Sequence, residues 1–327
     1  MTQNRPRLSI GMPVYNGDQF VAEALDSLLA QTFAEFELII SDNASTDRTS
    51  EICRSYASRD RRIRYSRNDV NIGPVKNFHR VFELADGVCF KWAHHDDRIA
   101  PDFLLKCMAV MESDPSIVIC YPQALVIDEN GKTVKQRQYG LDTSLIRPED
   151  RFRGVLGIDL GSPPICGIMR TDILRKTPLL AGSYASDQVL LAELALWGRF
   201  HEVREPLLLH RDHPERSVFV SPTRHLLAVW FDPSRAGRII LPVWGIFFEY
   251  LSSIGRAPLS WRERLRCRVQ MAKWARYRWR DMLEDLTIAA RQALGRAIPE
   301  QDHPVPESNS EFIETGTGRD IRRHAGQ

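Results

Sequence analysis

Short apolar runs alternate with amphipathic segments through the first 130 residues of the chain. The runs are brief and bounded by polar residues, which is typical of buried strands, and we predict strands over residues 8–14, 36–41, 63–66, 88–93 and 117–121. The segments between them repeat apolar residues at helical spacing, beginning near Phe20, Ile52, Val75 and Phe103. Strands and helices that alternate in this way predict a layered α/β domain with parallel strands and right-handed crossovers.

Beyond residue 125 the pattern changes. Glu129 to Lys132 predict a hairpin turn, and Gly161 to Pro164 predict a loop. A helix is expected over 186–198 and an extended segment over 200–209, after which the chain becomes helical and basic. We predict a main domain over 1–222, made of a half at 1–125 and a half at 126–222, then a helical extension at 223–298 and a disordered tail at 299–327.

Polar residues directly follow four of the predicted strands. In parallel α/β sheets, ligands bind outside the carboxyl ends of the strands, so we expect these four clusters to meet at one edge of the sheet. The clusters are Tyr15-Asn16-Gly17, Asp42-Asn43, Asn68 to Gly73 and His94-His95-Asp96-Asp97.

The overall charge and the cysteines narrow the function classes. Lys and Arg number 44 against 42 Asp and Glu, so the net charge of +2 favours no nucleic-acid partner. The six cysteines include no CxxC pair and no zinc-site spacing, which predicts buried free thiols. The N-terminus has no signal-peptide pattern, and the apolar stretch at 239–254 is too short to span a bilayer. We expect a cytoplasmic protein, either soluble or peripheral to the inner face of the membrane.

The edge carries neither a GxGxxG nor a GxxxxGK[ST] phosphate-binding pattern, which argues against classical dinucleotide and P-loop chemistry. Its adjacent carboxylates, Asp96 and Asp97, suit a hard divalent cation such as Mg²⁺ or Mn²⁺ with a phosphorylated or nucleotide-linked substrate. A helix cap with a surface ion pair would explain the same two residues equally well. Turn chemistry likewise accounts for Asp42, and a helix N-cap accounts for Asp187.

An ordered set of motifs resembles the family 2 glycosyltransferases. The set is Pro13-Val14-Tyr15-Asn16-Gly17, Ile40 to Asp47, Asn71-Ile72-Gly73, and Asp96-Asp97 with Pro101 four residues later. The resemblance is strong over 7–125 and weaker through Ser186-Asp187 and 198–213. It implies a GT-A fold, with a mixed sheet flanked by helices, a nucleotide-sugar donor, a divalent metal ion, and inversion at the anomeric carbon.

The resemblance also implies roles for individual residues. The nucleotide-sugar would be bound by Pro13, Tyr15, Asn16, Asp42, Asn71, Lys76 and Asp96. Asp96 and Asp97 match the motif that holds ribose and metal, with Asp97 as the better direct ligand, and His213 matches a late ligand of some relatives. Asp187 matches the general base. This chain has His94 where the family usually has an acid, which leaves open whether His94 or His95 contributes to the metal site.

The implied reaction moves a sugar, from a UDP-sugar first of all, to a hydroxyl of a glycan or lipid-linked acceptor in surface polysaccharide or glycolipid synthesis. Two alternatives are a nucleotidyltransferase and a non-catalytic nucleotide-sugar or glycan-binding scaffold. The first strand lacks the glycine-rich basic loop of nucleotidyltransferases. The four candidate acids are all present, which favours an active transferase over a scaffold; they are Asp42, Asp96, Asp97 and Asp187.

The segment 239–280 combines large aromatic residues with cations. Residues 256–280 alone hold eight Arg and one Lys against one acid, Glu263. An amphipathic segment of this kind can lie on an anionic membrane surface. Packing of its aromatic residues against the main domain explains the helical spacing more simply, with the arginines solvated. The sequence leaves open the sugar, the base, the acceptor and the oligomeric state.

Overall fold

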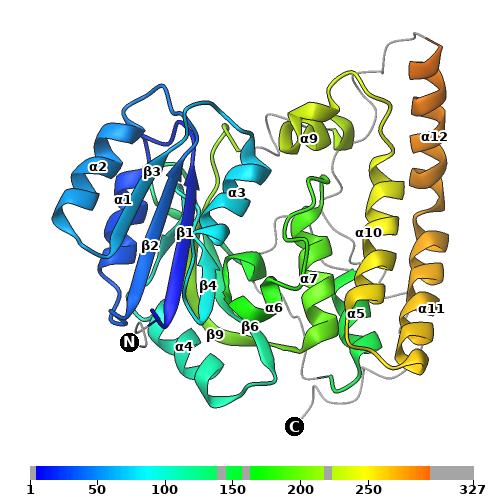
Figure 1. Cartoon of the computed structure of the whole chain (residues 1–327), viewed down its shortest axis with the longest axis horizontal. Coiled ribbons are helices and arrows are strands. Elements are labelled where there is room, and N and C mark those ends of the chain that lie inside the picture. Colours follow the sequence, from blue (N-terminus) through cyan, green and yellow to red (C-terminus); the bar gives the residue numbers. More distant parts are fainter. Residues whose placement is uncertain (1–4, 138–144, 157–162, 217–222, 295–327) are drawn as a thin grey trace.

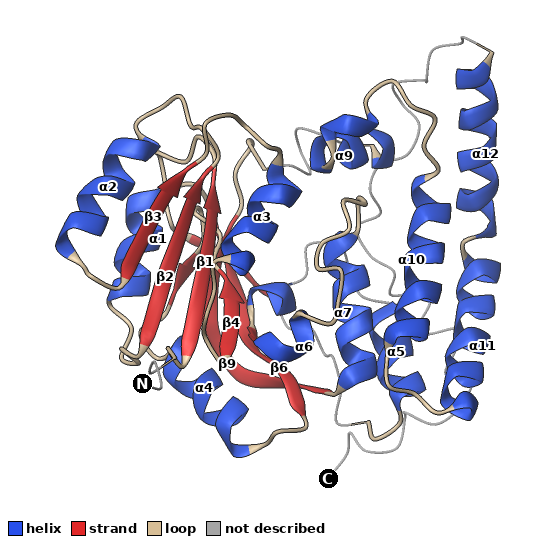
Figure 2. Cartoon of the chain, viewed as in Figure 1, coloured by secondary structure: helices blue, strands red, loops and turns tan. Residues whose placement is uncertain are grey.

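The computed structural model describes residues 5–137, 145–156, 163–216 and 223–294, and its centre is a nine-stranded mixed sheet (Figure 2). The strand order is β3-β2-β1-β4-β8-β6-β9-β5, and β7 pairs with β6. The strands are β1 (Leu8–Val14), β2 (Phe36–Asp42), β3 (Ile63–Arg67), β4 (Cys89–Trp92), β5 (Arg98–Ile99), β6 (Ile117–Ile127), β7 (Thr133–Arg137), β8 (Ile168–Arg170) and β9 (Arg199–Arg211).

Helices cover both faces of the sheet and form a separate layer beyond it (Figure 1). They are α1 (Val21–Leu29), α2 (Thr49–Arg59), α3 (Pro74–Glu83), α4 (Phe103–Ser113), α5 (Pro148–Leu156), α6 (Thr171–Leu174), α7 (Ser186–Trp197), α9 (Arg224–Phe231), α10 (Pro242–Arg256), α11 (Trp261–Tyr277) and α12 (Trp279–Ala293). Two short 3-10 turns, η1 (Pro163–Cys166) and η2 (Pro233–Arg235), complete the elements. No helix in these ranges is both long and apolar enough to cross a bilayer.

The predicted strands and helices of the first 121 residues are confirmed. β1 is buried along its whole length and pairs in parallel with β2 on one side and β4 on the other. A strand buried on both faces and both edges must be apolar at nearly every position, which explains why its sequence does not alternate. The short strand β5 was not predicted. It forms a two-residue antiparallel pairing with β9.

The second half adds antiparallel pairings, which make the sheet mixed. β6 and β7 form the predicted hairpin, with Gly131 at φ 80° in its turn. β8 runs antiparallel between β4 and β6, and β9 runs parallel to β6. The predicted loop at 161–164 lies partly outside the described residues, and its described part belongs to η1. The predicted tail at 299–327 also lies outside them.

Two apolar cores lie on opposite faces of the sheet. One core packs α1 and α4 against the strands. The six cysteines of the two cores are all buried and free, as predicted. The other extends from α3 and β4 through α7 to α5, α10 and α11 without a break. Its outer part includes Tyr250 and Trp274, whose rings meet edge to face with centroids 5.8 Å apart. Many aromatic residues of 239–280 therefore pack into a core.

Candidate active site

The four polar clusters predicted to share one edge of the sheet do lie together. The backbone N–H of Asn16 donates to Ser45 Oγ at 3.0 Å, and Asn43 Nδ2 donates to Asn71 Oδ1 at 2.8 Å. Gly17 approaches His95 so closely that a Cβ atom at this position would lie 2.3 Å from the imidazole ring. Contacts of this kind bring the loops after β1, β2, β3 and β4 together into one polar surface.

Residues predicted to hold the nucleoside line this surface with different degrees of exposure. Asp42 is fully buried, and its two oxygens accept hydrogen bonds from the Ser45 amide and the Tyr65 hydroxyl, both at 2.8 Å. Burial raises the pKa of Tyr65 to about 12, with a further contribution from its bond to Asp42.

The other residues predicted to bind the nucleotide-sugar differ in their exposure and in their contacts. Pro13 is buried beside Ser41 of β2, whereas Tyr15 is 44% exposed. Asn16 has a φ of 47° and accepts from the Thr46 amide at 2.8 Å, which holds the turn after β1. Lys76 is exposed in the first turn of α3. The turn after β1 thus exposes an aromatic side chain, Tyr15, and α3 exposes a cation, Lys76.

Asp96 and His213 face each other across the edge. Asp96 Oδ2 lies 3.1 Å from His213 Nε2, and the histidine ring packs on Phe20 with centroids 5.1 Å apart. Burial would raise the pKa of Asp96, but the bond to His213 and the charges of His95 and His94 bring it to about 2. Two ligands on adjacent corners of an octahedral ion with bonds of about 2.1 Å are also about 3 Å apart. The pair therefore has a spacing that suits a Mg²⁺-like or Mn²⁺-like ion.

Asp97 is the more deeply held of the two acids. Its Oδ1 accepts from the Arg211 amide at 2.9 Å, and it pairs with His210 Nδ1 at 3.0 Å. His94 Nδ1 lies 3.2 Å from Oδ2. Burial opposes ionisation, but His210 and His94 outweigh it and hold the pKa of Asp97 well below its usual range. Asp97 is thus an ionised carboxylate whose oxygens already have several partners.

Arg211 ties this edge together from the end of β9. Its guanidinium is fully buried and bonds to the Asp96 carbonyl at 2.9 Å and to Glu23 Oε2 at 2.8 Å. It also donates to the Glu129 carbonyl at 2.8 Å and lies 4.5 Å from the centre of the Phe20 ring. A planar guanidinium with five donors can hold several acceptors at once, which explains why an arginine occupies this buried position.

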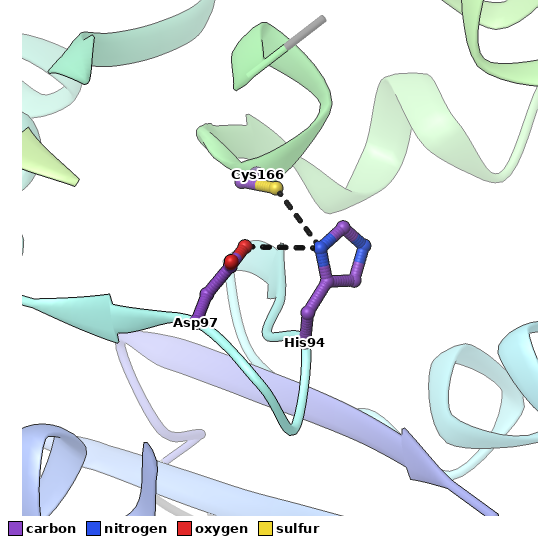
Figure 3. A group of neighbouring side chains, drawn as sticks. All are labelled: His94, Asp97 and Cys166. Atoms are coloured by element: carbon purple, nitrogen blue, oxygen red, sulfur yellow. Dashed lines mark hydrogen bonds and ion pairs between the residues drawn. The ribbon is translucent and has the colours of Figure 1, made fainter. Parts of the chain in front are cut away.

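Cys166, on η1, forms a second cluster with His94 and Asp97 (Figure 3). Its Sγ lies 3.6 Å from His94 Nδ1, so the thiol and a carboxylate oxygen approach the same ring nitrogen. Burial lowers the pKa of His94, but Cys166 and Asp97 outweigh it and raise the pKa well above its usual value. By ligand type, this set would suit zinc or another borderline ion more than Mg²⁺.

Lys91 lies in the same small cavity as these three side chains. It is almost fully buried, donates to the carbonyl oxygens of Cys166 and Trp92, and lies 4.6 Å from the centre of the Phe103 ring. Burial lowers the pKa of Lys91, while the neighbouring charges of Cys166 and Asp97 oppose that shift. A cation beside the thiol disfavours a second positive ion in this cavity.

Asp187 lies in the first turn of α7, but the N-cap of this helix is Ala185, so the suggested role of Asp187 as a helix N-cap is wrong. One oxygen of its carboxylate accepts from the Gln188 amide at 2.8 Å, and no side chain of the described residues donates to the other. Burial raises the pKa of Asp187, and the charge of His94 opposes that shift. A carboxylate with a raised pKa and no side-chain donor can accept a proton from a substrate hydroxyl.

Sequence reasoning missed Lys91, Cys166, His210 and Arg211 as parts of this region. His210 and Arg211 carried a signal, because they lie between a predicted extended segment and His213. Cys166 and Lys91 carried none, since each sits in a short run whose contacts depend on how β8 and η1 meet β4.

The chain matches a known family over its first half. A profile described as "Glycosyl transferase family 2" matches residues 9–177. An uncharacterized glycosyltransferase of Haemophilus influenzae is 31% identical over 132 residues, which is 40% of this chain and 52% of that protein. An uncharacterized glycosyltransferase of Methanocaldococcus jannaschii is 28% identical over 135 residues, 41% of this chain and 47% of that protein. The match thus spans about half the length of these relatives, and 14% of an uncharacterized Sinorhizobium fredii protein.

Solved structures agree with this assignment at the level of the fold. S. aureus TarS (residues 1–349) in complex with UDP-GlcNAc superposes with a TM-score of 0.63 at 19% identity, covering 88% of this chain and 81% of that one. The predicted GT-A fold, with a mixed sheet, flanking helices and a helical C-terminal region, is confirmed. Because the family profile covers half of the chain and the ordered motifs lie at one edge of this fold, the chain belongs to glycosyl transferase family 2.

Proposed function

We propose that this protein is an inverting glycosyltransferase that moves a sugar from a nucleoside-diphosphate sugar to an acceptor hydroxyl. One observation carries the proposal: Asp187 has a pKa raised by burial and no side-chain donor among the described residues, and the charge of His94, two residues before the Asp96 that pairs with His213, acts on it. A base and an anion-binding region must lie on either side of the anomeric carbon for direct displacement.

The donor would lie along the edge of the sheet. Asp42, with Pro13, Tyr15, Asn16 and Asn71 around it, would line the nucleoside pocket. Lys76 is exposed in the first turn of α3, where its charge and the helix N-terminus both favour a diphosphate. A UDP-sugar is our first choice of donor, since TarS, which shares this fold, is described in complex with UDP-GlcNAc.

Asp96 and His213 would hold a divalent ion, Mn²⁺ or Mg²⁺. The 3.1 Å spacing of their ligand atoms fits such an ion, and a mannosyltransferase of Pyrobaculum calidifontis with a TM-score of 0.50 is described in complex with GDP-Man and Mn²⁺. When bound, the ion supplies positive charge to the leaving diphosphate. Asp97 remains a predicted ligand, although its present partners suit a residue that positions the loop by holding His94 and the Arg211 amide.

The chemical step would then use this chain's own residues in a defined order. Asp187 takes the proton of the acceptor hydroxyl as that oxygen attacks the anomeric carbon, and the bond to the diphosphate oxygen breaks on the opposite face. Backside displacement inverts the anomeric configuration. We propose a glycan or lipid-linked acceptor, used in surface polysaccharide or glycolipid synthesis at the inner face of the membrane.

Donor binding is the first test. We would measure thermal shifts and calorimetric binding of UDP, GDP, dTDP and CDP, each with and without Mn²⁺ or Mg²⁺, because a ligand that binds only the native state raises its stability. We expect UDP to bind with metal dependence. Asp96→Asn should lose that dependence. Asp212→Asn, which changes a partly exposed acid paired only with Arg216 among the described residues, should keep it.

The outcome separates the proposed classes. Binding of no nucleotide by folded protein would contradict the proposal. Binding of a UDP-sugar without transfer or hydrolysis under any acceptor condition would favour a scaffold. Release of UDP with formation of a glycoside of inverted configuration, detected by proton NMR of the anomeric centre, would support the full mechanism.

A further inference from the structure

Helices α11 and α12 lie end to end along one edge of the molecule, opposite α1 and α2 (Figure 1). They attach through their inner faces. Cys267, Met271 and Trp274 of α11 and Met282 of α12 are buried in the core that they share with α10, and Ile288 of α12 is also buried. The outer faces of both helices therefore point away from the sheet and from the proposed active site.

The outer faces carry apolar residues at helical spacing. On α11, Trp261, Leu265 and Val269 recur every four residues, which places them on one face. On α12, Trp279, Leu283 and Leu286 follow at intervals of four and three residues, and Leu294 is the C-cap. Trp261 is 71% exposed and Leu294 is 73% exposed. These seven residues form the outer stripe, and no helix or strand of the described chain covers it.

Cations flank the outer stripe. The exposed ones on these helices include Arg262, Arg266, Arg268, Lys273, Arg276 and Arg280. Arg262 lies 5.3 Å from the ring centre of Trp261, and Arg280 lies 5.5 Å from that of Trp279. Arg268, Lys273 and Arg276 form no ion pair with any described residue.

The acids of the same helices point elsewhere. Glu263 completes the capping box of α11 with Ser260, and Asp285 is buried. Asp281 pairs with Arg224 and Arg278, and Glu284 also pairs with Arg224. The outer face is consequently apolar along its middle and positively charged along its margins.

We propose that the outer stripe docks on an anionic lipid surface, with its tryptophans and leucines in the headgroup region and its arginines on lipid phosphates. A helix with this arrangement lies in the plane of a membrane interface. A second copy of this chain fits less well, since a two-fold contact through the stripe would bring like charges together. The inference goes beyond the proposed function, because it concerns a surface distant from the proposed donor site.

The test uses the full chain and vesicles that float in a density gradient. We expect binding to phosphatidylcholine vesicles that contain phosphatidylglycerol and little binding to phosphatidylcholine alone. The variant Arg268→Gln/Lys273→Gln/Arg276→Gln should lower the partition coefficient by on the order of 100-fold, because each cation near an anionic surface contributes about 1 kcal/mol. Trp261→Ser/Leu283→Gln should also lose binding.

A matched control changes exposed apolar residues outside the outer stripe. Leu105→Gln/Val134→Gln alters side chains that are 46% and 64% exposed, and it should bind vesicles as the unchanged protein does. Unfolding temperature and UDP affinity should be unchanged in all three variants. Equal loss in the control, or equal binding to neutral and anionic vesicles, would overturn the proposal. So would a dimer in sedimentation that Trp261→Ser/Leu283→Gln dissociates.

Failure here and failure of the proposed function are distinguishable. Loss of UDP binding with intact flotation would contradict the donor site alone. Intact UDP binding without flotation would contradict the membrane surface alone.

Discussion

Asp96 and Asp97 are neighbours in the chain with different surroundings. Asp96 pairs with His213, whereas Asp97 accepts from the Arg211 amide and pairs with His210. The chain bends at His95 and Asp96 and then enters β5, which pairs with β9, so the two neighbouring acids have different partners. One is suited to bind a ligand, and the other is suited to hold the loop in place.

This difference predicts unequal effects on stability. Asp97→Asn should lower the free energy of unfolding by about 3 kcal/mol, because it leaves His210 and His94 without their buried counter-charge. Asp96→Asn should cost less, since Asp96 pairs with one histidine where Asp97 pairs with two, and its side chain is 18% exposed against 5% for Asp97. Urea unfolding at pH 7 measures both. Equal losses would contradict the separate roles.

Low pH should destabilise the folded protein through Asp97. The pKa of Asp97 is lowered in the folded state, so its stabilising effect is complete above the ordinary Asp pKa and is lost as the pH falls below it. We expect the stability difference between the unchanged protein and Asp97→Asn to shrink as pH falls below about 4. Unfolding curves from pH 7 to pH 3 test this. A constant difference would mean that Asp97 acts through packing alone.

The ionisation of Asp187 has the opposite effect on the free energy of unfolding. Burial raises its pKa, so ionisation opposes folding once the pH exceeds the ordinary Asp value. Asp187→Asn should therefore be at least as stable as the unchanged protein at pH 7, while transfer falls by roughly 100-fold to 10,000-fold. In the unchanged protein, the rate should increase as the pH rises through the raised pKa.

Initial rates and UDP affinity together test this role of Asp187. A variant that keeps UDP binding and loses turnover supports the general base. A variant with full turnover removes the assignment, and one that loses UDP binding shows that Asp187 acts on the donor instead.

At the scale of elements, α10 depends on a residue from another helix. Its N-terminus has no side-chain cap of its own, and Asp285 of α12 accepts from the Val243 amide at 2.7 Å and the Trp244 amide at 3.3 Å. Trp244 Nε1 also donates to the Met282 carbonyl at 2.9 Å. The start of α10 is thus fixed by α12, through a residue that lies 42 positions after Val243 in the chain.

Two substitutions separate the cap from the charge of Asp285. Burial raises its pKa to about 6 despite the two amide bonds, so ionisation weakens folding as pH rises from about 4 to 6. Asp285→Ala should destabilise by about 1 kcal/mol through loss of the cap. Asp285→Asn should keep an acceptor without the charge and be at least as stable as the unchanged protein at pH 8. Thermal unfolding at pH 5 and pH 8 measures both, and equal loss in the two variants would contradict this account.

At the scale of the whole molecule, α7 joins the sheet to the outer helices. Glu193 of α7 is buried and pairs with Arg256 of α10 at 2.7 Å, and Ser253 donates to the same carboxylate at 3.1 Å. Around this pair, one apolar core runs from β4 to α11. The predicted division into 1–222 and 223–298 therefore separates α7 from α10 and α11, although these helices share one core.

This continuity predicts the result of truncation. A chain of residues 1–222 should lose cooperative unfolding or aggregate, because the apolar surface of α7 that packs on Ile246, Tyr250 and Ile254 would face water. A chain of residues 1–298, which lacks only the segment predicted as a tail, should unfold with the midpoint of the full chain. Near-ultraviolet circular dichroism and thermal unfolding compare them. A folded, UDP-binding 1–222 fragment would show that the predicted main domain is independent.

The sequence by itself determined the order of elements in the first half, because most strands there are short apolar runs and the helices between them carry apolar residues at helical spacing. It also determined which loops meet, since parallel strands bring their carboxyl ends to one edge. It did not determine β5 or the position of Cys166, because pairings of two or three residues leave no periodic signal.

Only the tertiary structure decided the partners of charged groups. Which of Asp97 and Asp96 faces the interior depends on where His210, Arg211 and His213 lie. These residues stand at the end of β9 and just after it, more than a hundred positions after the two acids in the chain. The tertiary structure also decides the burial of the aromatic residues in the last third of the chain. Most aromatic residues of α10 pack in or against the core, whereas Trp261 of α11 and Trp279 of α12 are exposed. Helical spacing predicts that such residues share a face, but the neighbouring helices determine which face is covered.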